Sequence, residues 1–291
     1  QGRLAWIALV PLIVACRGLG PLSSSLIGLI YGMIAHALVF SWIFNVPGFR
    51  WVHFGLLAFY FGLYPALWCG GLALFRRSKL PLLIAAPALW VTLDFIRAHA
   101  GFLAFPWGTF AYTQHANLPL LQVMTLTGEY GVTFLLVMAN IAIYELIFNR
   151  AWRNALVALA LILATWSWGC YEMNKTPAPG QTIRVAVVQP SILLSERKTA
   201  AGRLASLERL EHLTRKAARQ KPDFIVWPET ALRGFPNEPK QAERIKNLVR
   251  IVQTPLVLGT SEYEKYSLPV NPGEHVAKFG TRSYNSAYLV L

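Results

Sequence analysis

The 291-residue chain is more apolar and less charged than an ordinary soluble protein. Hydrophobic residues make up 55% of it and charged residues 14%, whereas roughly a quarter of the residues in soluble domains are charged. Its net charge is +13, yet residues 1–180 hold only 10 of the 27 basic and 4 of the 14 acidic residues. The composition therefore predicts two physically different halves, and no phosphate-binding loop, metal cluster or nucleic-acid motif stands out in either.

The first half, residues 1–171, is predicted to be a bundle of about six membrane spans. A bilayer core is crossed by about 20 apolar residues, and segments near that length cover residues 22–44, 52–75, 119–148 and 153–171. Two further spans are expected at 81–98, which contains Pro87, Asp94 and Arg97, and at the short segment 4–16. A large soluble helical core is the alternative, but so many apolar runs with so few charges favour a membrane.

The distribution of positive charge predicts the orientation of these spans. Loops on one side carry six positive residues and loops on the other carry three: Arg17, Arg76, Arg77, Lys79, Arg150 and Arg153 against Arg3, Arg50 and Arg97. Because cytoplasmic loops are enriched in Lys and Arg, the residues after about 172 are expected outside the cytoplasm. The N-terminus would then also lie outside, and we expect a further span upstream of Gln1.

The second half is predicted to be an α/β layer built on one sheet. A linker, 172–182, contains two prolines and a glycine. The elements expected after it are strands at 183–189, 223–227, 255–259 and 283–291, helices at 203–220 and 238–253, and a loop or ragged hairpin at 261–282. The first strand, helix and second strand form a βαβ unit, which favours a parallel pair. Because the chain stops inside an apolar strand, we expect a fragment truncated at both ends.

Glu229 is the candidate catalytic residue of this half. It follows the strand that ends at Trp227 and Pro228, and the carboxyl ends of strands are where catalytic groups gather in open α/β sheets. Apolar bulk from Phe224 and Trp227 would raise its pKa and suit it to general-base work. The alternative is a capping or loop carboxylate paired with Arg233. All three cysteines lie in the first half, so the second half offers neither a disulfide framework nor a zinc site.

Several motifs resemble known families. VAVVQP (185–190), DFIVWPET (223–230), LVLGTSE (256–262) and SYNSA (283–287) occur in the order seen in the first part of the nitrilase superfamily domain. In the first half, AAPALWVTLDFIR (85–97), FPWGTFAYTQ (105–114) and GEYGVTFLL (128–136) resemble the membrane region of bacterial apolipoprotein N-acyltransferase. That family joins a membrane bundle to a periplasmic nitrilase-like domain, so the resemblance implies an αββα sandwich, truncated here, at residues 183–291.

The resemblance also implies a mechanism. The family uses a Glu-Lys-Cys triad, in which the cysteine takes an acyl group from a phospholipid as a thioester and the amine of a diacylglyceryl-cysteine then attacks it, a ping-pong scheme. Glu229 matches the family's general base. The family's lysine and cysteine come after the last strand of this sequence, so Lys265 and Lys278 are not assigned that role. The chain as given is therefore expected to be inactive. The loop after Pro190 also lacks the tryptophan that the family often has there.

Three aromatic residues and two acids complete the predictions. Phe105, Trp107 and Tyr112 are predicted to line a lipid entry between the bundle and the outer domain, or else to form an aromatic belt at the membrane interface. Glu129, an acid near the start of a span, is either functional or paired, and pairing with Tyr130 or a neighbouring helix is the preferred expectation. Glu145 is expected to extend towards the cytoplasmic interface near Arg150. The net charge of +7 after residue 180 would attract anionic headgroups or is an ordinary solvated surface.

The sequence thus predicts an acyltransferase of the bacterial inner membrane, with its catalytic domain on the periplasmic side. Its expected partners are a phospholipid acyl donor, a diacylglyceryl apolipoprotein and the lipid bilayer, with no cofactor, metal or nucleic acid. Two alternatives remain open. One is a membrane-tethered carbon–nitrogen hydrolase with the same triad and water as the acceptor, and the other is a non-catalytic membrane protein that binds lipid or lipoprotein.

Overall fold

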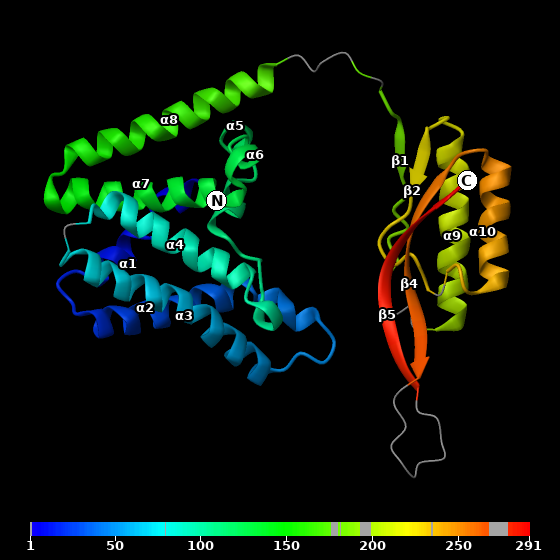
Figure 1. Ribbon diagram of the computed structural model, residues 1–291, viewed down its shortest axis with the longest axis horizontal. Coiled ribbons are helices and arrows are strands. Elements are labelled where there is room, and N and C mark those ends of the chain that lie inside the picture. Colours follow the sequence, from blue (N-terminus) through cyan, green and yellow to red (C-terminus); the bar gives the residue numbers. More distant parts are fainter. Residues whose placement is uncertain are drawn as a thin grey trace, which may run out of the picture. The chain divides into compact units, whose positions relative to one another are not determined.

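The computed structural model describes residues 2–78, 80–175, 180, 182–192, 199–233, 235–267 and 279–291. The chain divides into two compact units, Gln1–Thr176 and Pro177–Leu291, called here the helical unit and the α/β unit (Figure 1). Each unit has a hydrophobic core of its own. Lys79, Lys278 and the loop residues 193–198, together with 176–179 and 181 of the expected linker, lie outside the described residues.

The helical unit contains eight α-helices and four short 3₁₀ helices in its described residues. In chain order they are η1 (Gly2–Trp6), α1 (Val10–Ala15), α2 (Pro21–Val39), η2 (Ser41–Asn45), α3 (Trp51–Phe75), α4 (Leu82–Ala98), η3 (Gly101–Leu103), η4 (Phe110–Gln114), α5 (Leu118–Leu121), α6 (Met124–Thr127), α7 (Glu129–Asn149) and α8 (Trp152–Asn174). Within the described residues, α2, α3, α7 and α8 are long and apolar enough to cross a membrane.

Three of the six expected spans differ from the structure in their bounds. The segment 4–16 is divided between η1 and α1, and α4, in the span expected at 81–98, has 17 residues, the lower end of the length that crosses a bilayer core. The run 119–148 is also interrupted, because Gly128 has a φ of 62°, a conformation that glycine adopts without a steric penalty. The long helix therefore begins at Glu129 rather than at 119, after the short helices α5 and α6.

Helix α7 occupies the centre of the helical unit. It packs against α4 on one side and α8 on another (Figure 1). About two-thirds of the residues in the apolar stretch of α7 are buried, whereas the apolar stretches of α2 and α8 are mostly exposed. The exposed apolar surface of α2 and α8 is what lipid-facing helices present. Asn140 of α7 is buried. Its Oδ1 accepts a hydrogen bond from the Leu9 backbone N–H (2.8 Å), and its Nδ2 donates one to the Ala5 carbonyl (2.9 Å). Asn140 thus satisfies backbone groups at the break between η1 and α1.

Helices α2 and α3 pack closely against each other. A Cβ added at Gly28 of α2 would lie 2.3 Å from the Pro65 carbonyl oxygen of α3, and one added at Gly32 would lie 2.8 Å from Gly62 Cα. Glycine at these positions is what allows the two backbones to approach, as small residues do between helices in membranes.

The α/β unit confirms the predicted alternation of strands and helices. Its elements are β1 (Val185–Val187), α9 (Ala200–Ala218), β2 (Phe224–Val226), β3 (Leu232–Arg233), α10 (Pro239–Val252), β4 (Leu256–Ser267) and β5 (Phe279–Val290). The strands β1, β2, β4 and β3 are parallel in that order, and β5 pairs with β4 in the antiparallel sense. The pair β1–β2 is the predicted parallel pair, and β3 was not predicted.

Two features of this sheet position the site. Helices α9 and α10 lie side by side on one face of it (Figure 1). The hydrophobic core of the α/β unit includes Leu210, Ile225, Ile245, Leu256 and Leu258. Within the segment 261–282, residues 261–267 and 279–282 belong to the antiparallel β4–β5 ladder, which runs from Leu256–Val290 to Ser267–Phe279, and residues 268–278 lie outside the described residues. The long antiparallel strands therefore carry residues of β5 past the carboxyl end of β2.

Candidate functional site

Glu229 lies where the sequence places it, three residues past the end of β2, but it is not enclosed as expected. Its side chain is exposed. The neighbouring Trp227 is buried and turned into the core, where its indole N–H donates to Thr214 Oγ1 of α9 (2.8 Å). The Trp227 side chain, which was predicted to surround the carboxylate, therefore packs in the core instead. This corrects the predicted enclosure while leaving the predicted position intact.

A side-chain amide and a close backbone contact hold Glu229. Asn285 Nδ2 of β5 donates a hydrogen bond to Glu229 Oε1. The backbone of Pro228 and Glu229 also packs closely against Gly259 of β4. A Cβ added at Gly259 would lie 2.7 Å from the Pro228 carbonyl oxygen and 2.8 Å from Glu229 Cα, so only glycine allows this approach. The side chain of Arg233, the alternative partner, lies outside the described residues.

A small pocket of about 140 Å³ lies beside Glu229 within the α/β unit. Its walls come from the segments that follow β1 and β2 and from α9, and its lining residues include Gln189, Ser191, Ser206, Leu210 and Glu229. The segments after two adjacent parallel strands thus meet at one edge of the sheet, the usual place for a ligand in such folds. The described residues contain no group of three or more His, Cys, Asp or Glu side chains that could hold a metal.

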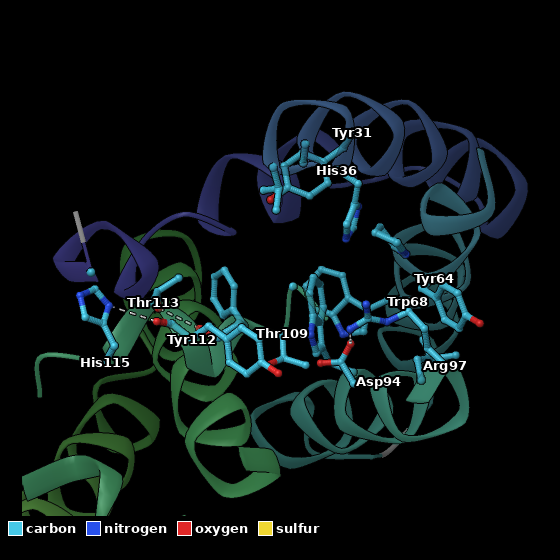
Figure 2. A pocket seen from close by; sticks show the side chains of 18 residues that line it. Tyr31, His36, Tyr64, Trp68, Asp94, Arg97, Thr109, Tyr112, Thr113 and His115 are labelled. Carbon is cyan, nitrogen blue, oxygen red and sulfur yellow. Dashed lines mark hydrogen bonds and ion pairs between the residues drawn. The ribbon is translucent and has the colours of Figure 1, made fainter. Parts of the chain in front are cut away.

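A larger cavity of about 460 Å³ lies inside the helical unit (Figure 2). Aromatic side chains make up much of its wall, including Tyr31, Tyr64, Trp68, Trp90, Phe110 and Tyr112. A few polar groups converge on it, with His36 of α2 across the cavity from Asp94 and Arg97 of α4 (Figure 2). An apolar cavity with a small number of placed polar groups is the usual form of a small-molecule or lipid site.

Arg97 organises one wall of this cavity. It is 2% exposed and bonds Asp94 Oδ1 through Nη2 (2.9 Å). Its Nη1 donates to the Trp107 carbonyl (2.6 Å) and, at 3.4 Å, to the Phe105 carbonyl, while its guanidinium lies 5.2 Å from the centre of the Phe61 ring. One buried cation therefore ties the end of α4 to the loop that follows.

The three predicted substrate-contact residues separate into two groups. Tyr112 of η4 lines the cavity and is half exposed. Phe105 and Trp107 do not line it, and they belong to an adjoining aromatic cluster, with their ring centres 5.4 Å apart. Phe105 also packs edge-on against Phe61 (5.1 Å), and Trp107 lies 5.9 Å from Trp42. Arg97 holds the loop on which both sit.

The two acids of α7 are both satisfied, but by unexpected partners. Glu129 accepts a hydrogen bond from the Thr109 hydroxyl (2.9 Å), so it is paired as predicted, though by a loop residue before η4. Glu145 is buried and accepts Asn154 Nδ2 of α8 (2.6 Å). The prediction that Glu145 extends to the interface is therefore wrong, because the neighbouring helix supplies an amide donor inside the unit.

Sequence reasoning missed Asn285, Arg97 and His36 as site residues. Asn285 stands in the SYNSA motif and Arg97 in the 85–97 motif, so both were noticed without a role. Their roles depend on contacts to Glu229 and to the 105–107 loop that sequence spacing does not give. His36 lies within the apolar segment 22–44, and the sequence feature that could have pointed to it is a polar side chain inside a predicted span.

Comparison with known proteins agrees with these observations. Residues 2–142 match the family model described as the apolipoprotein N-acyltransferase N-terminal domain. Over 283 residues the chain is 34% identical to "Apolipoprotein N-acyltransferase" of Geobacter metallireducens, an alignment that covers 90% of this chain and 53% of the relative. A protein of the same name from Vibrio vulnificus is 27% identical, with 80% of this chain and 47% of the relative covered.

A third relative, "Apolipoprotein N-acyltransferase 2" of Treponema pallidum, is 28% identical over 79% of this chain and 48% of its own length. The chain thus spans about half the length of the curated relatives it matches. The four long apolar helices among the described residues fit a membrane protein. Over the part of these relatives that it spans, the chain is similar to apolipoprotein N-acyltransferases, and its residues 2–142 match the model of that family's N-terminal domain.

Proposed function

We propose that the protein transfers a fatty acyl chain from a phospholipid to the N-terminal amine of a diacylglyceryl-cysteine on an apolipoprotein. The observation that carries the proposal is the position of Glu229 at the carboxyl end of β2, in a chain related over 90% of its length to a protein named for this activity. General bases in open α/β sheets are found at that edge.

In the proposed mechanism Glu229 acts as general base in both half-reactions. It first takes the proton of a cysteine thiol, and the thiolate attacks the ester carbonyl of the phospholipid. The lysophospholipid oxygen leaves with that proton, and a thioester remains. The amine then attacks the thioester, Glu229 takes its proton, and the thiol is restored. We propose that the thiol and a lysine partner follow β5 in the family's αββα sandwich, of which the β1–β5 sheet would be one layer.

We further propose that the helical unit supplies the lipid-binding part of the enzyme. The 460 Å³ cavity is apolar enough for an acyl chain and has few polar groups, and Tyr112 lies in its wall. Phe105 and Trp107, which share the loop held by Arg97, are the proposed entrance residues. The excess of Lys and Arg in one set of loops supports an inner-membrane protein whose α/β unit is periplasmic.

Two other functions are consistent with parts of these observations. A carbon–nitrogen hydrolase would use the same base with water as the acceptor, and a non-catalytic protein would use only the lipid cavity. Similarity in the helical unit, where residues 2–142 match a family defined by acyl transfer, favours the acyltransferase over both.

The test is acyl transfer from a phosphatidylethanolamine with a labelled acyl chain to a diacylglyceryl lipopeptide, with the protein expressed from its complete reading frame. We expect Glu229→Gln to lower transfer by at least 10²-fold, the usual range for a general base. Glu243→Gln is the matched control, since Glu243 is an exposed acid of α10 on the same unit. Unchanged thioester formation in Glu229→Gln would exclude Glu229 as the base of the first half-reaction, and unchanged overall transfer would remove it from the mechanism. Release of free fatty acid without transfer would favour the hydrolase.

A further inference from the structure

The geometry points to Asn285 as the positioning residue of Glu229, an amide that fixes one carboxylate oxygen so that the other is presented to the substrate. This inference rests on the proposed function of Glu229. The inference adds to the proposed site a residue of β5 that lies 56 positions after Glu229 in the chain.

Both partners of this hydrogen bond are anchored by backbone structure. Asn285 lies within the β4–β5 ladder, where its Cα faces that of Ser261. On the other side, the Trp227 backbone N–H donates to the Val257 carbonyl of β4 (2.8 Å), and Gly259 lies directly beneath the Pro228–Glu229 backbone. The amide and the carboxylate are therefore brought together from two strands that both pair with β4.

The chemistry of the donor suits a base. A neutral amide donates one hydrogen bond to Oε1 without adding a positive charge, whereas a Lys or Arg at that position would form an ion pair and weaken the carboxylate as a proton acceptor. The amide of Asn285 is bonded to Oε1 of Glu229, and Glu229 lines the 140 Å³ pocket. In this inference the other carboxylate oxygen, Oε2, is the one that receives the proton.

The bond is poorly suited to a purely structural role. Asn285 and Glu229 are both exposed, and hydrogen bonds between exposed groups contribute little to stability because water replaces them. Two other β5 side chains, Tyr284 and Tyr288, bond acids of β4, so they act within the hairpin. Asn285 instead reaches the loop after β2, where an exposed glutamate would otherwise sample several rotamers.

The experiment measures acyl-enzyme formation and transfer with labelled phosphatidylethanolamine in Asn285→Ala and Asn285→Asp. Loss of orientation at a reacting group costs up to about 10²-fold in rate, so we expect kcat to fall 10- to 100-fold with KM within about 2-fold. Asn285→Asp should be no better than Asn285→Ala, since a carboxylate has no proton to donate. Tyr284→Phe is the control, because it removes a different exposed hydrogen bond from the same strand.

Coupling to Glu229 separates positioning from a general defect. In the Glu229→Gln background, Asn285→Ala should cause no further loss, because residues that act as a unit are not additive. Full additivity, or kcat within 3-fold of the parent enzyme, would overturn the inference. An independent readout is the carboxylate band of Glu229, isolated as the infrared difference between the parent and Glu229→Gln. Asn285→Ala should shift it and Tyr284→Phe should not. If the parent transfers no acyl group, the proposed function fails, while the infrared shift still decides whether Asn285 holds Glu229.

Discussion

Removal of Arg97 should destabilise the helical unit more than removal of any exposed arginine. Arg97→Ala leaves Asp94 buried at 8% exposure without its counter-charge and frees the Trp107 carbonyl, which Arg97 bonds at 2.6 Å. Hydrogen bonds to charged groups are each worth about 1.5–3 kcal/mol, and breaking a buried ion pair from one side costs about 3–5 kcal/mol. Since two such bonds are lost, we expect a loss of about 3–5 kcal/mol.

The assay is unfolding in detergent, followed by tryptophan fluorescence, with a double-mutant cycle. Asp94→Ala combined with Arg97→Ala should lose less than the sum of the single changes, because neither charge is then left alone. Arg17→Ala is the control, since Arg17 is exposed and its guanidinium lies 5.0 Å from the centre of the Phe148 ring; the loss of this contact should cost about 1 kcal/mol or less. Equal losses for Arg97→Ala and Arg17→Ala, or strict additivity in the cycle, would refute the role assigned to Arg97.

Three further outcomes are expected from the same structure. Gly28→Ala should destabilise the α2–α3 pair by about 1–3 kcal/mol through overpacking, whereas Gly55→Ala, whose Cβ meets nothing within 4 Å, should stabilise α3 by about 0.5–1 kcal/mol; thermal unfolding of the two variants gives the signs. Trp227→Phe should cost about 1–2 kcal/mol in denaturant unfolding, because it deletes a buried hydrogen bond and some volume. The hydrogen bond that the Tyr288 hydroxyl donates to the Glu262 carboxylate raises the pKa of Tyr288. Its stabilisation is therefore present below the ordinary tyrosine pKa of 10.0 and lost as pH rises through the folded value; ultraviolet titration of Glu262→Gln should show a lower pKa, and an unchanged curve would contradict this.

The α/β unit was largely predictable because its signals are local. Strands such as 223–227 are short apolar runs between turn residues, and the helices carry their apolar residues at three- and four-residue steps. These patterns gave the order of elements and the position of Glu229 at a strand end. They could not give β3, whose two residues, Leu232 and Arg233, have too little length for a period.

The helical unit was predictable in its long apolar runs and unpredictable in its interruptions. Hydropathy averages over about twenty residues, so a single φ of 62° at Gly128 leaves no mark on it. The partners of buried polar groups were also out of reach. Glu145 was expected at the interface because Arg150 is near in sequence, whereas its actual partner, Asn154, is brought to it by the turn between α7 and α8.

The amide of Asn140 has a consequence for how the chain assembles. Its side-chain oxygen accepts a hydrogen bond from the backbone N–H of Leu9, which lies 131 residues earlier in the sequence. Ribosomes add about 5–20 residues each second. On the order of ten seconds therefore passes between synthesis of the η1–α1 segment and synthesis of the side chain that satisfies its backbone. The η1–α1 segment is thus fixed long after it is made, and until α7 is synthesised its open backbone groups must be hydrogen-bonded by water or by the translocation machinery.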